Sequence, residues 1–210
     1  RHCAAAISPR YPLVELGTAL MFAGVAVLFG PAVLEAADAY AAVSAALVLV
    51  AFLYLTAISI ALAAIDLESH RLPNAIVLPT YAVAVVLLGA AALLTTDLAS
   101  FARAAAGAGA LFAFYLVLAL IAPRGMGMGD VKLAGVLGLY LGWVGWGALA
   151  VGSLAAFVLG GIVGIALIVV RRASRSTAIP FGPWMLAGAW IGIVFGEWIA
   201  VSYLALFGMN

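Results

Sequence analysis

Long apolar segments separated by short polar ones dominate the chain. Runs of about 18 or more apolar residues indicate membrane-spanning helices. From Val131 to Val170 the only charged residue is Lys132, and one helix of that length would measure about 60 Å, twice a bilayer core. We therefore expect the chain to fold back within 142–147, which is rich in glycine and tryptophan. The predicted spans are 13–30, 40–65, 75–94, 104–122, 131–142, 148–170 and 184–207.

Composition agrees with a membrane protein. Of the 210 residues, 68% are apolar and 8% are charged, a balance that soluble domains do not need. We predict an all-α helix bundle with about seven transmembrane helices, formed as one domain over residues 1–210, with membrane lipid as a partner. The net charge of +1 gives no indication of nucleic-acid binding, and the single cysteine, Cys3, allows no internal disulfide.

Basic residues are distributed unevenly between the two sides that seven spans define. Segments 1–12, 66–74, 123–132 and 171–183 share one side and hold eight Lys and Arg residues, whereas the polar loop expected at 95–103 holds only Arg103. Loops rich in Lys and Arg face the cytoplasm. The bias predicts a multi-pass membrane protein with the four basic segments inside the cell.

Two aspartates stand out on this predicted cytoplasmic side. Asp130 follows Gly125, Gly127 and Gly129 in the segment GMGMGDVK, and Asp66 ends the second apolar run. An acidic side chain at a membrane boundary is a functional hypothesis by default, and glycines allow another chain to approach closely. Because both aspartates lie where a helix meets the cytoplasm, they can meet in space although they are far apart in sequence.

Paired carboxyl groups permit a specific chemistry. Two adjacent aspartates do not both ionise easily, so one keeps a proton. The ionised carboxylate can take a proton from water while the neutral carboxyl donates a hydrogen bond to a carbonyl oxygen, which is aspartyl peptide hydrolysis and needs no metal. The only histidines are His2 and His70, so Ser-His catalysis or a multi-histidine metal site lacks partners.

Four blocks of sequence resemble one known family. Gly127 to Asp130 resemble the GxGD motif of intramembrane aspartyl proteases. Residues 65–74 (IDLESHRLPN) resemble the first-aspartate region of bacterial type IV prepilin peptidases, the A24-type leader peptidases, and residues 129–133 (GDVKL) resemble the second. Residues 179–183 (IPFGP) resemble their C-terminal turn, and residues 7–16 (ISPRYPLVEL) resemble the entry to their catalytic membrane domain.

The resemblance implies a function. Enzymes of this family remove the short basic leader of prepilins and type II secretion pseudopilins at the cytoplasmic face, just before the apolar helix of the substrate. Asp66 and Asp130 correspond to the catalytic pair. The resemblance therefore implies a prepilin or pseudopilin helix as the partner and the bacterial cytoplasmic (inner) membrane as the location.

Five further residues are candidates for shaping the site or binding substrate. Gly127 and Gly129 adjoin Asp130 and could hold an unwound substrate segment. Pro73 ends any helix that precedes it and belongs to the first-aspartate block. Glu68 is a candidate contact for a basic leader, and Lys132 either follows the positive-inside pattern or acts on Asp130 by its charge.

The start of the chain departs from the family pattern. Long members carry two Cys-x-x-Cys pairs that bind zinc, and Arg1-His2-Cys3 resembles the tail of the last pair. We therefore expect residues 1–12 to be the cytoplasmic remnant of a longer N-terminal segment. Cys3 alone makes no structural zinc site, so zinc, and S-adenosylmethionine for methylation of the new N-terminus, are expected only in a longer form. Proteolysis itself needs no cofactor.

Two alternatives stay open. A presenilin-like protease shares GxGD, but such proteins have Tyr-Asp at the first aspartate, where this chain has Ile65-Asp66, and their Pro-Ala-Leu motif is absent. A small ion-coupled transporter could use two aspartates as proton or cation sites, but that function favours acids near mid-membrane on broken helices.

Overall fold

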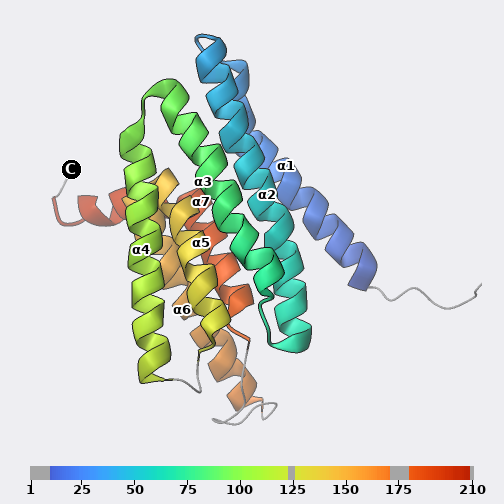
Figure 1. Ribbon diagram of the computed structural model, residues 1–210. Coiled ribbons are helices and arrows are strands. Elements are labelled where there is room, and N and C mark those ends of the chain that lie inside the picture. Colours follow the sequence, from blue (N-terminus) through green and yellow to red (C-terminus); the bar gives the residue numbers. More distant parts are fainter. Residues whose placement is uncertain (1–9, 123–125, 171–179, 209–210) are drawn as a thin grey trace, which may run out of the picture.

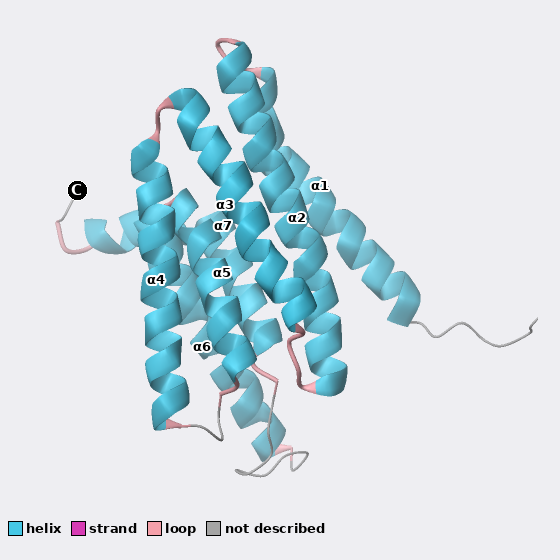
Figure 2. Ribbon diagram, viewed as in Figure 1, coloured by secondary structure: helices cyan, strands magenta, loops and turns pink. Residues whose placement is uncertain are grey.

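The computed structural model describes residues 10–122, 126–170 and 180–208. Within these ranges every regular element is an α-helix, and the helices form one bundle (Figures 1 and 2). The helices are α1 (Arg10–Leu34), α2 (Ala39–Ser69), α3 (Asn74–Thr95), α4 (Leu98–Ile121), α5 (Met128–Val144), α6 (Trp146–Val169) and α7 (Gly182–Ala205). Segments 1–9, 123–125 and 171–179, and with them Cys3 and Gly125, lie outside the described residues.

The predicted fold class is confirmed. In the described part of the chain, six helices are long and apolar enough to cross a membrane, and α5 is the seventh, shorter helix. With 17 residues, α5 measures about 25 Å. It runs through the centre of the bundle, where Val131 and every residue from Leu133 to Gly142 are buried. A helix that is apolar all round belongs in such a position.

Aspartates begin two of the helices and correct one expected boundary. The side chain of Asp38 accepts a hydrogen bond from the Ala41 N–H (2.8 Å) at the start of α2. Asp97 accepts one from the Ser100 N–H (3.1 Å), so α4 begins at Leu98. The expectation that Ser100 and Arg103 lie in a polar loop was wrong, because the Asp97 cap starts the helix before them.

Glycines let two pairs of neighbouring helices pack backbone against backbone. A Cβ atom at Gly107 of α4 would lie 2.6 Å from the Gly138 carbonyl oxygen of α5, and one at Gly142 would lie 2.6 Å from the Arg103 carbonyl oxygen. On α7, a Cβ atom at Gly192 would lie 2.5 Å from the Ala148 carbonyl oxygen of α6. Small residues allow this close approach in membrane bundles, so α4–α5 and α6–α7 form tight pairs.

The predicted break between α5 and α6 occurs at Gly145, and two charged side chains occupy it. Arg103 of α4 donates from Nε to the Gly142 carbonyl (2.7 Å) and from a terminal nitrogen to the Trp143 carbonyl (2.8 Å). Glu197 of α7 accepts from the Gly147 N–H (2.9 Å) and the Ala148 N–H (3.2 Å). Arg103 thus places a positive charge at the C-terminal end of α5, and Glu197 places a negative charge at the N-terminal end of α6. Both charges interact favourably with the helix dipoles.

Two tyrosines, Tyr140 in α5 and Tyr81 in α3, give a matched test of stability. Among the described residues the Tyr140 hydroxyl is buried and has no hydrogen-bond partner, whereas the Tyr81 hydroxyl donates to the Lys132 carbonyl (2.6 Å). Removing an unpaired buried hydroxyl relieves a desolvation cost, and removing a paired one strands its partner. We expect Tyr140→Phe to leave stability unchanged or raise it by about 1 kcal/mol, and Tyr81→Phe to lower it by about 1 kcal/mol, in detergent unfolding. A larger loss with Tyr140→Phe than with Tyr81→Phe would contradict this.

Candidate active site

Asp66 lies in the last turn of α2, and its carboxylate faces the start of α7. The side chain is buried, with 4% of its surface exposed. Its Oδ2 accepts a hydrogen bond from the Gly182 N–H (3.0 Å). The helix stops directly afterwards, because His70 adopts a left-handed conformation (φ 53°) and Pro73 begins α3. Asp66 therefore links the end of α2 to the start of α7, which are far apart in sequence.

Asp130 lies in the first turn of α5 and is held in a similar way. The Gly127 N–H donates to Asp130 Oδ2 (2.9 Å), while the Asp130 N–H donates to the Gly127 carbonyl (3.1 Å). The bond from the Gly127 N–H is one half of a helix capping box, in which a side chain in the first turn accepts from the N-cap backbone; glycine has no side chain for the other half. This bond fixes the carboxyl group at the N-terminal end of the central helix, where the dipole favours negative charge.

Leu72 connects the surroundings of the two aspartates. A Cβ atom at Gly129, next to Asp130, would lie 3.0 Å from Leu72 Cβ. A Cβ atom at Gly182 would lie 3.3 Å from Leu72 Cδ2 and 2.6 Å from Asp66 Oδ2. The glycine beside each carboxyl group thus contacts the same leucine side chain. The structure brings α2, α5 and α7 together at one end of the bundle, with both aspartates there.

The charge state of Asp130 reflects this arrangement. Burial raises the pKa of Asp130 to about 6. The hydrogen bond from the Gly127 backbone lowers this pKa, and the charge of Asp66 raises it. The pair therefore has a member that keeps its proton at a pH where a free aspartate would be ionised.

The other predicted site residues have different positions. Gly127 begins α5 and Gly129 contacts Leu72, as just described, so both lie beside Asp130. Pro73 begins α3 and is half-buried near the same end. Glu68 is exposed at the end of α2. Lys132 is turned toward α3, where its Nζ donates to Asn74 Oδ1 (3.0 Å).

Three contacts near the aspartates were not predicted. Gly182 donates to Asp66, Leu72 bridges the two glycines, and Tyr81 donates to the Lys132 carbonyl in α5. A signal for Gly182 was present, because its Pro-Phe-Gly-Pro turn lies on the same predicted side as both aspartates. Leu72 and Tyr81 carry no comparable signal, since an apolar loop residue and a helical tyrosine occur throughout membrane proteins.

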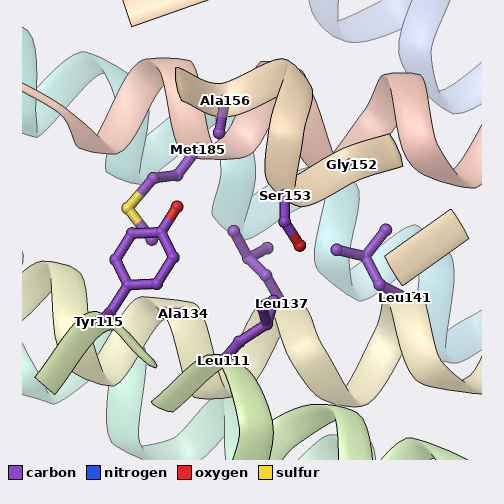
Figure 3. A pocket seen from close by; sticks show the side chains of 9 residues that line it. All are labelled: Leu111, Tyr115, Ala134, Leu137, Leu141, Gly152, Ser153, Ala156 and Met185. Carbon is purple, nitrogen blue, oxygen red and sulfur yellow. The ribbon is translucent and has the colours of Figure 1, made fainter. Parts of the chain in front are cut away.

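A small cavity lies between α4, α5, α6 and α7 (Figure 3). Its volume is about 10 Å³, which is room for about one water molecule. Figure 3 shows Tyr115, Leu137 and Met185 around it, with the Ser153 side chain at one side. A cavity of this size does not admit a peptide. Over the described ranges, no group of three or more His, Cys, Asp or Glu side chains could hold a metal ion.

A comparison with protein families agrees with this arrangement. The model of the type IV leader peptidase family matches residues 53–165, more than half of the chain. The chain belongs to the type IV leader peptidase family. The matched region contains both Asp66 and Asp130, and the resemblance seen in the sequence blocks is confirmed. Gly182 and α1 lie outside the region that defines the leader peptidase match.

Curated relatives extend the leader peptidase match over nearly the whole chain. A prepilin leader peptidase/N-methyltransferase of Aeromonas hydrophila is 36% identical over 215 residues, which cover 99% of this chain and 66% of the relative. Proteins with the same name from Pseudomonas putida and Pseudomonas aeruginosa are 37% and 32% identical, each over 66% of its own length and 98% and 99% of this chain. The chain thus spans about two thirds of the length of these relatives. No solved structure matches it.

Proposed function

We propose that this member of the leader peptidase family is a membrane aspartyl endopeptidase that removes the leader from type IV prepilins or pseudopilins. The observation that carries the proposal is the pair of aspartates on separate helices, each with one carboxyl oxygen held by a backbone N–H. The names of the curated relatives support the substrate class. A peptidase of this kind needs two carboxyl groups that share one proton, and the raised pKa of Asp130 favours that state.

The two carboxyl groups have complementary roles in this mechanism. The ionised group takes a proton from water as the water oxygen attacks the scissile carbonyl carbon. The neutral group donates its proton to the carbonyl oxygen, so a tetrahedral diol forms. Return of a proton to the amide nitrogen then breaks the C–N bond and releases an acid and an amine. The Gly127 and Gly182 N–H groups each leave the second oxygen of their aspartate free for this proton exchange.

We propose that the site faces the cytoplasm of a bacterial inner membrane. The excess of Lys and Arg in the segments at the aspartate end supports this orientation. The partners in this setting are the substrate helix and membrane lipid, and no nucleic acid. Glu68, exposed beside the site, is the proposed contact for the basic leader. Proteolysis by this mechanism uses the two carboxyl groups and water and needs no cofactor.

The function is tested by mixing membranes that contain this protein with a prepilin-type substrate. The mass of the product is read at its new N-terminus, because the mass identifies the bond that was cut. The control substrate is identical except for a charged residue within the first apolar residues after the leader. Cleavage only at the leader junction supports the proposal, and no cleavage by correctly inserted protein overturns it.

The pH dependence of cleavage follows from the pKa of Asp130. A raised aspartate pKa means that the folded protein holds the proton until the pH rises through about 6, and above this the doubly ionised pair increases. Well below this pH both carboxyl groups are protonated. We expect a bell-shaped profile of kcat, with an alkaline limb whose apparent pKa belongs to the pair. A rate that keeps rising to pH 9, in protein that stays folded, would contradict a shared proton.

A further inference from the structure

The helix α1 packs on the rest of the bundle less than any other long helix. Of an 18-residue apolar stretch in α1 only 6% is buried, whereas 39% of the corresponding stretch is buried in α2 and in α7. The C-terminal half of α1 contacts α2, where Phe29 stacks on Phe52 with ring centroids 4.2 Å apart. Its other half leads away from α2, and Figure 1 shows the two helices diverging toward the end of α2 that carries Asp66. The backbone of α1 is therefore farther from α2 on the side of the aspartates than at Phe29.

An apolar groove lies between α1 and α7. Its volume is about 470 Å³, and the residues that line it are Met21, Gly24, Val25, Val27, Leu28, Trp190 and Val194. The groove has a fixed wall, because the Trp190 indole N–H donates to Ser59 Oγ of α2 (3.2 Å). On α1 the backbone is accessible, since a Cβ atom at Gly17 or Gly24 would meet nothing within 4 Å. Small residues with open space beside them allow another helix to approach closely.

The wall of the groove is connected to Asp66 through α2 and α7. Ser59 precedes Asp66 by seven residues on α2, which is about 10 Å. Trp190 follows Gly182 by eight residues on α7, which is about 12 Å. The Gly182 N–H donates to Asp66, so the two helices behind the groove meet at Asp66. A helix that lies along this wall would have its end at Asp66.

We propose that the groove between α1 and α7 receives the apolar helix of the prepilin-type substrate, with the N-terminal end of that helix at the aspartates. This inference rests on the proposed function and gives the enzyme a docking surface for the membrane part of its substrate. The groove sets the register of cleavage, because a helix seated against Trp190 has about seven or eight residues between that contact and the scissile bond. The substrate enters laterally where α1 diverges from α2.

A second groove serves as a matched control. It lies between α3 and α4, has a volume of about 430 Å³, and is lined by Val85, Val86, Gly89, Ala90, Leu93, Leu98 and Phe101. These residues belong to the end of α3 and the start of α4, at the opposite end of the bundle from the aspartates. It is apolar and of similar size, but it does not lead to Asp66. If the groove between α1 and α7 binds only lipid acyl chains, it should behave like this control groove in the tests below.

Cross-linking tests the proposal. Single cysteines replace Gly24 or Val194, and separately Val86 or Leu93, in a Cys3→Ser, Asp130→Asn background that leaves the substrate uncut. Substrates carry one cysteine at successive positions after the leader junction. We expect cross-links from positions 24 and 194 to substrate residues about 7 to 12 after the scissile bond, with a helical period. Equal cross-linking from positions 86 and 93 would overturn the proposal, and so would cross-links only between two copies of the enzyme.

A steric variant gives an independent readout. Gly24→Phe fills the groove from a position with open space, and Val86→Phe is its control. We expect Gly24→Phe to raise KM for the membrane-embedded substrate about tenfold, which is about 1.4 kcal/mol, and to leave cleavage of a short peptide spanning the leader junction unchanged. Unchanged KM, or an equal loss on both substrates, would overturn the groove. Cleavage of the membrane substrate by wild type tests the proposed function separately.

Discussion

Replacement of Asp66 or Asp130 by asparagine is expected to lower cleavage of a prepilin-type substrate by about 10²- to 10⁴-fold, the range in which positioned acids and bases act. Asparagine has the size of aspartate but cannot exchange a proton. Each carboxyl group has one oxygen held by a backbone N–H, so the substitution keeps the hydrogen-bond geometry while removing the chemistry. The measurement is the rate of appearance of the shortened product in membranes with equal amounts of inserted protein.

Asp97 provides the control for this loss. It caps α4 at the other end of the bundle, and asparagine caps a helix about as well as aspartate. Asp97→Asn should therefore cleave at the wild-type rate. Near-wild-type cleavage by either Asp66→Asn or Asp130→Asn would contradict the proposed carboxyl pair, because each member is needed in every turnover.

Replacement of Gly182 by alanine is the second large effect that we expect. The new Cβ atom would lie 2.6 Å from Asp66 Oδ2 and 3.3 Å from Leu72 Cδ2. The carboxyl group must move away, and a displacement of about 1 Å in a catalytic group can cost about 100-fold in rate. We expect kcat to fall by about that factor, with a small change in KM, because Gly182 does not line the proposed groove for the substrate helix.

Gly161→Ala is the matched variant for this test. A Cβ atom at Gly161 on α6 would meet nothing within 4 Å, so the substitution adds the same atom to a membrane helix without a contact. It should leave kcat unchanged. If Gly182→Ala also leaves kcat unchanged, the Gly182 N–H does not orient Asp66 for the reaction.

The sequence predicted the helices well because their signals are local. Apolar length identified all seven segments, and the break within 142–147 follows from the length limit that a bilayer sets on one helix. The position of Asp66 and Asp130 at one end of the bundle also follows, because seven spans and the distribution of Lys and Arg fix which segments share a side. These arguments need only the order of residues along the chain.

Contacts between helices were beyond the sequence. The pattern of polar residues placed Arg103 in a loop, whereas it lies in α4 and binds the end of α5. Glu197 is an acid within the last apolar run, and the sequence does not indicate its partner. In the structure it accepts a hydrogen bond from the Gly147 N–H at the start of α6. The role of Gly182 depends on the side by which α7 meets α2. Such features arise from the rotation and pairing of helices, and apolar residues on every face leave that rotation undetermined.

The side chains at the break between α5 and α6 impose an order on the insertion of the chain during synthesis. Arg103 precedes α5, so the end of α5 has its partner as soon as it enters the membrane. Glu197 comes 50 residues after Gly147, and until then two N–H groups of α6 lack their carboxylate. The arrival of α7 satisfies these groups and brings the Gly182 N–H to Asp66 at the other end. In a nascent chain Asp66 therefore lacks the N–H group that orients it until α7 is in place.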